Sequence, residues 1–250
     1  MIHLKTPQEI EKMKVGGAML RKTVEKLIPS IQVGVSTKEI DLEAERLIRA
    51  EGGEPSFKRV KGYKWTTCLP INEQAVHTPP SDRVVQNGDV LTLDIGVYYE
   101  GLHTDYATTF IVGTKKDPKV ETFLHIGQAT LEKAIAQVQK GVRLGTIGEY
   151  IHSEITRAGY FILKDLTGHG VGKELHEDPY VFNYLDRPVE KTYEVPSGLT
   201  IAVEIIYSMG SEKIAYEPGV PWSIISKDRS IAACFERSIA VSDKETFILT

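Results

Sequence analysis

The chain has 250 residues, enough to bury the core of one large domain or of two small ones. Hydrophobic residues make up 41% and charged residues 26%, and the net charge of −4 argues against a nucleic-acid partner. The N-terminus lacks the apolar segment of a secretory signal, and no apolar stretch reaches the ~20 residues of a membrane span. With only two cysteines, Cys68 and Cys234, the sequence predicts a soluble cytoplasmic protein without a membrane or nucleic-acid partner.

Four helices are predicted, two in each half of the chain. Capping boxes at Thr6–Glu9 and Ser36–Glu39 open the first two. In the second half, a helix is expected from about Lys119 to Gly141. A third capping box, Thr146–Glu149, is expected to begin a helix that ends at Gly159.

The two halves of the chain resemble each other. Their helix positions coincide at an offset of 107 residues, and the strand patterns Gly88–Ile95 and Gly198–Ile205 coincide at an offset of 110. Asp94 and Glu204 thereby take equivalent places, each six residues after a glycine. We expect one domain over residues 1–250, with related halves at about 1–113 and 114–250. Its fold would be α+β, with antiparallel strands facing a shared interior and helices outside.

Five residues of ligand type lie in apolar or glycine-rich segments that otherwise resemble buried core. An unpaired buried charge is costly, so carboxylates placed there need a partner. A pair of divalent cations satisfies many carboxylate oxygens at once and can drive hydrolysis. The sequence therefore predicts a two-metal site formed by Asp94, Asp105, His169, Glu204 and Glu236.

The two aspartates are expected to lie on neighbouring strands of a hairpin. If its turn is centred between Tyr99 and Glu100, Asp94 faces Asp105 directly. The Cβ atoms of such a pair lie about 4.5–5.5 Å apart, so the carboxylates would repel unless a cation sits between them. The alternative is a solvated polar pair on an exposed hairpin, which the apolar residues around Asp94 disfavour.

Single residues of the set also have structural alternatives. Glu236 could form a buried salt bridge with Arg237 or Arg229. A histidine in a core is more often simply hydrogen-bonded than a metal ligand. His77, at a strand end or in a loop, could be either a hydrogen-bonded residue or a ligand, and His103 is left unassigned.

Other catalytic motifs are absent from the sequence. The segment His176–Tyr180 does not match H-E-x-x-H, and there is no G-x-G-x-x-G, P-loop or G-x-S-x-G pattern. Two distant cysteines cannot form a structural zinc site. An oxygen-rich ligand set with one imidazole suits Mn²⁺, Co²⁺, Fe²⁺ or Zn²⁺.

Taken together, these segments resemble the type I methionine aminopeptidases, enzymes of the pita-bread fold, over nearly the whole chain. The matching motifs are Asn72-Glu73 ahead of His77, Gly88-Asp89 ahead of Asp94, the Asp94–Asp105 spacing, Gly168–Gly172, His176–Pro179 and Lys227–Ser230 ahead of Glu236. The resemblance implies that the five ligands hold two divalent ions, with Asp105 and Glu236 bridging. It also implies that His77 and His176 contact the substrate and that Tyr63, Cys68 and Trp222 line a methionine pocket.

The activity implied by the resemblance is removal of N-terminal methionine from peptides or nascent chains when the second residue is small. Water activated by the two metals would attack the scissile amide, with Glu204 as proton shuttle and with His77 and His176 stabilising the oxyanion. The enzyme would be a monomer, with the ribosome as an optional partner.

The chain departs from the family pattern without losing a ligand. It has Val76-His77-Thr78 where Cys-His-Gly is common, Ile205 in place of proline, Arg237 in place of histidine and Leu175 in place of an aromatic residue. Leu175 is expected to loosen the methionine pocket and admit leucine or norleucine. Thr78 is expected to add bulk near the scissile bond.

Two alternatives remain open at this point. An X-Pro peptidase would share the five ligands on the same fold, although that family usually carries an additional N-terminal domain. A catalytically inactive binding protein is a third hypothesis, and such relatives usually lose ligands, whereas this chain keeps all five.

Overall fold

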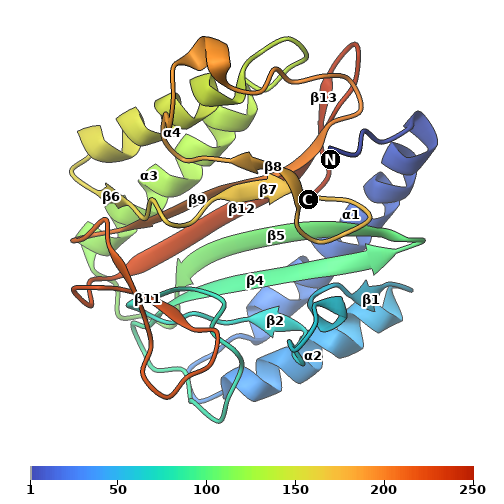
Figure 1. Ribbon diagram of the computed structural model, residues 1–250. Helices are drawn as coiled ribbons and strands as arrows, with labels where there is room; N and C mark the ends of the chain where they lie inside the picture. Colours follow the sequence, from blue (N-terminus) through green and yellow to red (C-terminus); the bar gives the residue numbers. More distant parts are fainter. Residues whose placement is uncertain (1) are drawn as a thin grey trace.

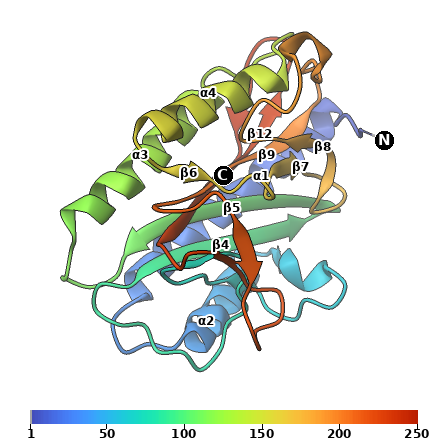
Figure 2. The same ribbon diagram turned by 60° about the vertical axis from the view of Figure 1, so that its left-hand side comes forward.

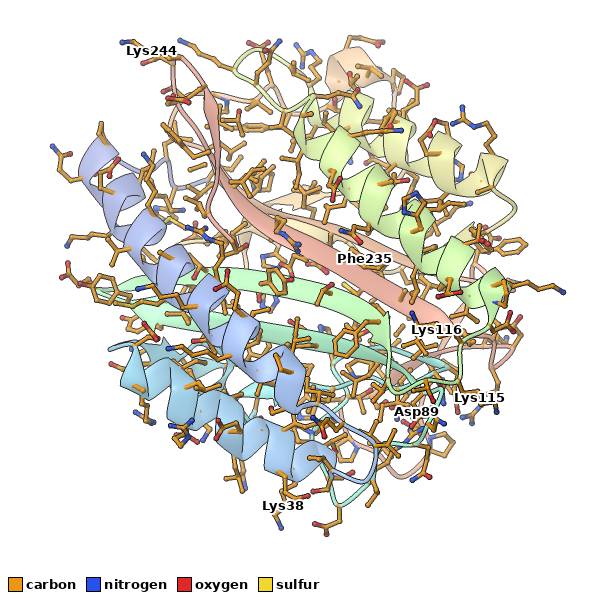
Figure 3. All side chains as sticks on the ribbon, turned by 180° about the vertical axis from the view of Figure 1, so that it is seen from behind. Lys38, Asp89, Lys115, Lys116, Phe235 and Lys244 are labelled. Atoms are coloured by element: carbon orange, nitrogen blue, oxygen red, sulfur yellow. The ribbon has the colours of Figure 1, made fainter. Side chains whose placement is uncertain are left out.

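Four helices cover one face of a large antiparallel sheet in the computed structural model, which describes residues 2–250 (Figure 1, Figure 3). The helices are α1 (Pro7–Leu27), α2 (Thr37–Ala50), α3 (Pro118–Ile135) and α4 (Leu144–Arg157). Three 3₁₀ turns accompany them: η1 (Ile28–Ser30), η2 (Phe57–Arg59) and η3 (Val189–Lys191).

The first two helices begin as their sequences predict. Thr6 and Ser36 each accept a hydrogen bond from the backbone N–H three residues on, at 3.2 and 3.3 Å. The carboxylates of Glu9 and Glu39 accept from the backbone N–H of the capping residue, both at 2.8 Å. Both capping boxes are therefore confirmed.

The third predicted capping box is wrong. Helix α4 begins at Leu144, two residues before Thr146, and no side chain caps it at Arg143. A distant loop satisfies its first N–H groups instead. The N–H of Leu144 donates to the carbonyl of Tyr193 at 2.9 Å, and that of Gly145 donates to Oγ1 of Thr192 at 3.1 Å. Tertiary contacts thus set this helix start, which local sequence could not reveal.

The large sheet has ten strands in the main order β1-β4-β5-β12-β9-β7-β8. In that order, the seven strands are β1 (Glu54–Pro55), β4 (Val90–Tyr99), β5 (Leu102–Ile111), β12 (Ala232–Val241), β9 (Thr200–Ser208), β7 (Gly168–Gly170) and β8 (Glu177–Val181). Strands β2 (Thr67–Cys68), β6 (Phe161–Ile162) and β13 (Thr246–Ile248) pair with β4, β9 and β12. A second sheet joins β10 (Ile214–Tyr216), β11 (Ile224–Ser226) and β3 (Gln74–Val76).

The β4–β5 hairpin has a different register from the predicted one. Glu100 and Gly101 both have positive φ, 45° and 88°, so these two residues form the turn. Asp94 consequently pairs with Ala107, and Asp105 pairs with Gly96. The prediction that the two aspartates face each other directly is wrong. The observed partner of Asp94 lies two residues after the predicted one. Because side chains alternate with a period of two, both aspartates still point to the same face of the sheet.

Alternation along the strands separates a helix-covered face from a polar one. Leu91, Leu93 and Ile95 of β4 pack into the core under α1 and α2, and Phe235 of β12 packs under α3 (Figure 3). Residues on either side of these point to the opposite face, because successive side chains of a strand alternate. The fold thus places the predicted carboxylates on the sheet face that the helices leave open.

Candidate metal centre and active site

Three of the predicted ligands lie in one row across the four long strands. Glu204 of β9 pairs with Glu236 of β12, Glu236 pairs with Ala107 of β5, and Ala107 pairs with Asp94 of β4. Asp105 precedes Ala107 by two residues and therefore shares its face. Ala107 has a small side chain, so it leaves space between the carboxylates of Glu236 and Asp94 on either side of it.

His169 reaches this row from the neighbouring strand β7, where it pairs with Ala202. Its Nε2 lies 3.2 Å from Oε1 of Glu204 and 3.9 Å from the nearest carboxylate oxygens of Asp105 and Glu236. Its Nδ1 is 2.9 Å from the carbonyl of Gly170, an acceptor that holds the ring with Nε2 toward the carboxylates. The structure therefore brings all five predicted ligands to one place.

The centre is buried and strongly acidic. Asp105, Glu236 and His169 are 4%, 3% and 5% exposed. Burial raises the pKa of Asp105 to about 7, with the Glu204 carboxylate adding to the effect and His169 opposing it. Burial and the neighbouring carboxylates raise the pKa values of Asp94 and Glu236 well above their usual range. Burial lowers the pKa of His169, but Glu204 and Asp105 outweigh it and the net shift is upward.

The alternative that Glu236 forms a salt bridge is not what the structure contains. The Arg237 guanidinium donates to the backbone carbonyls of Ala107 and Glu236, at 3.2 and 2.6 Å, and Arg229 lies 3.4 Å from Glu73. Oε1 of Glu236 is buried and has no hydrogen-bond partner within residues 2–250. Asp105, His169 and Glu236 offer ligand atoms within 4.8 Å of one another. This oxygen-rich set with one imidazole fits a divalent cation of the Mn²⁺ to Zn²⁺ series.

Two further histidines border the same cavity. His77 follows β3 with a left-handed backbone, φ 59°, and its side chain lines the cavity beside the carboxylates. His176 precedes β8, and its ring centroid lies 4.4 Å from that of His169. Burial lowers the pKa of His77, and burial together with the nearby histidines lowers that of His176 to about 3. Both rings are therefore neutral near pH 7, and each has one N–H to donate.

The residues of the predicted methionine pocket line the same cavity as these histidines. Tyr63, Cys68 and Trp222 line a cavity of about 100 Å³ that also contains the carboxylates. The Tyr63 hydroxyl donates to the carbonyl of Thr67 at 2.8 Å and lies 3.1 Å from the Cys68 sulfur. The Trp222 ring meets that of Tyr63 edge-on, with centroids 5.6 Å apart. This part of the cavity thus offers aromatic walls and a sulfur atom next to the carboxylates.

Several residues that line the cavity lie outside the motifs of the sequence. Phe57 and Val60 lie in the η2 region, outside any motif, and also line the cavity. Cys234 lines it too, and its position two residues before Glu236 on one strand could have revealed it. The Thr78 side chain is buried, with its hydroxyl 2.8 Å from that of Ser223, and its effect near the scissile bond stays a prediction.

Comparisons with known proteins identify the family of the chain. The family model of Metallopeptidase family M24 matches residues 11–243, and the chain belongs to this family. A methionine aminopeptidase of Mycoplasma capricolum is 36% identical over 251 residues, covering 100% of this chain and 98% of that protein. The crystal structure of a methionine aminopeptidase from Thermotoga maritima matches with a TM-score of 0.95 at 33% identity, covering 100% of this chain and 99% of the other.

Within the family, the full-length matches place the chain among the bacterial type I methionine aminopeptidases and confirm the pita-bread fold. The prolidase of Pyrococcus furiosus shares the fold, with a TM-score of 0.79 at 21% identity, but this chain spans only 65% of its length. The similarity to the X-Pro enzymes is therefore one of fold alone.

Proposed function

We propose that the protein removes N-terminal methionine from peptides and nascent chains whose second residue is small. The observation that carries this proposal is a buried acidic centre that opens directly into a narrow apolar pocket with a cysteine sulfur and aromatic walls. A thioether side chain suits such a pocket, because soft sulfur and aromatic contacts stabilise methionine. Full-length similarity to methionine aminopeptidases supports the same conclusion.

Asp94, Asp105, His169, Glu204 and Glu236 would hold two divalent ions of manganese, iron, cobalt or zinc. When bound, the ions would supply Lewis-acid activation of water and of the scissile carbonyl. The Glu204 carboxylate accepts the proton of the attacking water and delivers it to the leaving amine. Neutral His77 and His176 donate their N–H groups to the oxygen that becomes negative at the tetrahedral stage.

The pocket residues provide the discrimination. Tyr63, Cys68 and Trp222 surround the methionine side chain. Leu175, which is buried against Phe57, forms part of the pocket wall and is smaller than the aromatic residue common in the family. One missing methylene contact is worth about 1–3 kcal/mol, so leucine and norleucine should be accepted at reduced rates.

The setting that we propose is the cytoplasm, with a monomeric enzyme acting on emerging N-termini and with the ribosome as an optional partner. Within residues 2–250, none of the helices combines the length and the apolar character of a membrane-crossing segment. The net charge of −4 supports a polypeptide rather than a nucleic acid as the substrate.

Comparing Met-Ala-Ser with Ala-Pro-Ala, after metal stripping and with each divalent metal added back, tests the proposal. We expect Met-Ala-Ser to be cleaved and Ala-Pro-Ala to be inert. Faster cleavage of Ala-Pro-Ala would assign the chain to the X-Pro peptidases. No cleavage of either peptide with any metal would favour an inactive binding protein.

A further inference from the structure

An aromatic row runs away from the catalytic cavity along strand β8 and the segment after it. Tyr180 lies on β8, and Phe182 and Tyr184 follow at alternate positions just beyond the end of the strand at Val181. The ring centroids of Tyr180 and Phe182 lie 6.1 Å apart, and those of Phe182 and Tyr184 lie 5.6 Å apart. Tyr180 is 67% exposed, and the proposed chemistry gives this large aromatic side chain no role.

This row connects two hollows on the surface. A groove of about 540 Å³ is lined by His77, His176 and Glu204 together with Tyr180. A second cavity of about 320 Å³ is lined by Tyr180, Phe182 and Tyr184. Because Tyr180 borders both, the hollows meet at this residue, and a chain leaving the catalytic groove there comes to the second cavity next.

We propose that Tyr180, Phe182 and Tyr184 form an extended binding surface for the substrate residues that follow the third one. The proposal rests on the proposed aminopeptidase function and names the part of the substrate that this surface binds: an extended, unfolded N-terminal segment. An extended chain advances about 6.7 Å per two residues, close to the spacing of the rings. Successive side chains on one side of the substrate would therefore meet successive rings.

The position of β8 in the sheet supports an extended occupant. β8 is the last strand of the main sheet order and pairs with β7, so its outer side lies at the margin of the sheet (Figure 1, Figure 2). Edge strands accept further extended chains, and binding grooves beside them read alternate side chains. A substrate running from the cavity along β8 would have both the rings and this edge beside it.

The experiment measures kcat/KM for a series of neutral peptides that begin Met-Ala-Ser and have three, six and nine residues. With wild-type protein we expect kcat/KM to rise at least 10-fold from three to nine residues, mainly through a lower KM. Tyr180→Ala should remove about 3- to 10-fold of this gain, as expected for the loss of one aromatic contact, and leave tripeptide hydrolysis within 2-fold. Phe182→Ala should act likewise, with its melting temperature measured because this ring is partly buried.

Phe161→Ala is the matched control, since Phe161 is a 41% exposed aromatic residue on β6 that lines neither hollow. It should keep the wild-type length dependence. A wild-type enzyme that cleaves all lengths equally would overturn the proposal, and so would a Tyr180→Ala variant with the wild-type ratio of long to short peptides. A wild-type protein that fails even on the tripeptide would instead contradict the proposed function, so the two failures are distinguishable.

Discussion

The fold buries the Asp105 and Glu236 carboxylates beside other carboxylates, and the guanidinium of the neighbouring Arg237 donates to backbone carbonyls. Without a cation, this arrangement destabilises the ionised protein, and the raised pKa values of both groups express that cost. The centre therefore contributes to function at the expense of the stability of the metal-free chain.

A pH-dependent stability of the metal-free protein follows. The pKa of Asp105 is about 7 in the folded protein and about 3.9 in an unfolded chain, so folding favours the protonated form. Asp105 should therefore make stability fall as pH rises from about 4 to 7, and the raised pKa values of Asp94 and Glu236 add to this fall. The raised pKa of His169 acts in the same direction, because its favourable charged form is lost as pH rises.

Melting temperatures in chelator between pH 5 and 8.5 measure this effect. Asp105→Asn, which removes the charge but keeps the shape, should make the pH profile less steep and abolish turnover. Adding Mn²⁺ or Co²⁺ should stabilise the wild-type protein at pH 8 and have little effect on the variant. Equal pH profiles for both proteins, or full activity of the variant, would contradict the two-metal centre.

The two cavity histidines should affect the rate and not the metal content. His77→Ala and His176→Ala are each expected to lower kcat about 10²- to 10³-fold, the usual effect of losing one preorganised donor to the transition state. Metal analysis of the purified variants should remain near the wild-type value. His176→Gln, which retains an N–H donor, serves as the conservative control. A variant that loses its metal would show that the histidine in question is a ligand.

At the scale of elements, the row across β4, β5, β12 and β9 depends on a small residue. Ala107 lies between Glu236 and Asp94, is fully buried, and faces the carboxylates. Ala107→Leu should reduce metal affinity at least 10-fold without changing any ligand, since its side chain would enter the space between them. Overpacking would also cost about 1–3 kcal/mol of stability. Isothermal titration with Mn²⁺ measures the effect, and Ala107→Ser, similar in size, should bind like wild type. Equal affinity in Ala107→Leu would show that the space is not needed.

The sequence predicts an element well when the residues that fix its ends are close together along the chain. The capping boxes at Thr6 and Ser36 involve four consecutive residues, and the structure confirms both. The start of α4 is set by Thr192 and Tyr193, nearly fifty positions away, and its prediction failed. The carboxylate set was predictable because buried charge is rare, whereas Ala107 gave no such signal. The hairpin register depended on which two residues turn, a choice that Glu100 obscures because a non-glycine residue seldom takes positive φ.

At the scale of the whole molecule, we propose that the two halves, residues 1–113 and 114–250, are related units of one domain. Both bounds of α4 lie 107 positions after those of α2. The halves meet where β5 pairs with β12, and each supplies part of the centre: Asp94 and Asp105 come from the first half and the other three residues from the second. Neither half alone should therefore bind two metals.

Co-expression of the two halves as separate chains tests this arrangement. We expect them to associate and to recover some hydrolysis of Met-Ala-Ser, because the β5–β12 pairing and the buried core across it would re-form. Each fragment expressed alone should lack activity and remain poorly folded. A half that folds and binds metals without its partner would contradict the single-domain proposal.

The N-terminal segment supports the cavity from a distance of 172 residues along the chain. The Lys5 ammonium forms a buried ion pair with Glu177, which directly follows His176, and its side chain passes over Gly172 in space that a Cβ would occupy. The other oxygen of Glu177 accepts from the N–H of Glu174 at 3.0 Å. Lys5 thus binds one end of the loop that carries His176 and packs against the other, and we assign it as a positioning residue.

Lys5→Met should lower kcat about 10- to 100-fold with little change in KM for Met-Ala-Ser, because a displaced donor fails at the transition state more than in binding. The lone buried Glu177 should also cost about 3–5 kcal/mol of stability. The double variant Lys5→Met/Glu177→Gln removes the stranded charge and should regain most of the stability while kcat stays low. Lys5→Arg should restore part of kcat. If the double variant recovers both stability and full kcat, Lys5 serves folding alone and does not position His176.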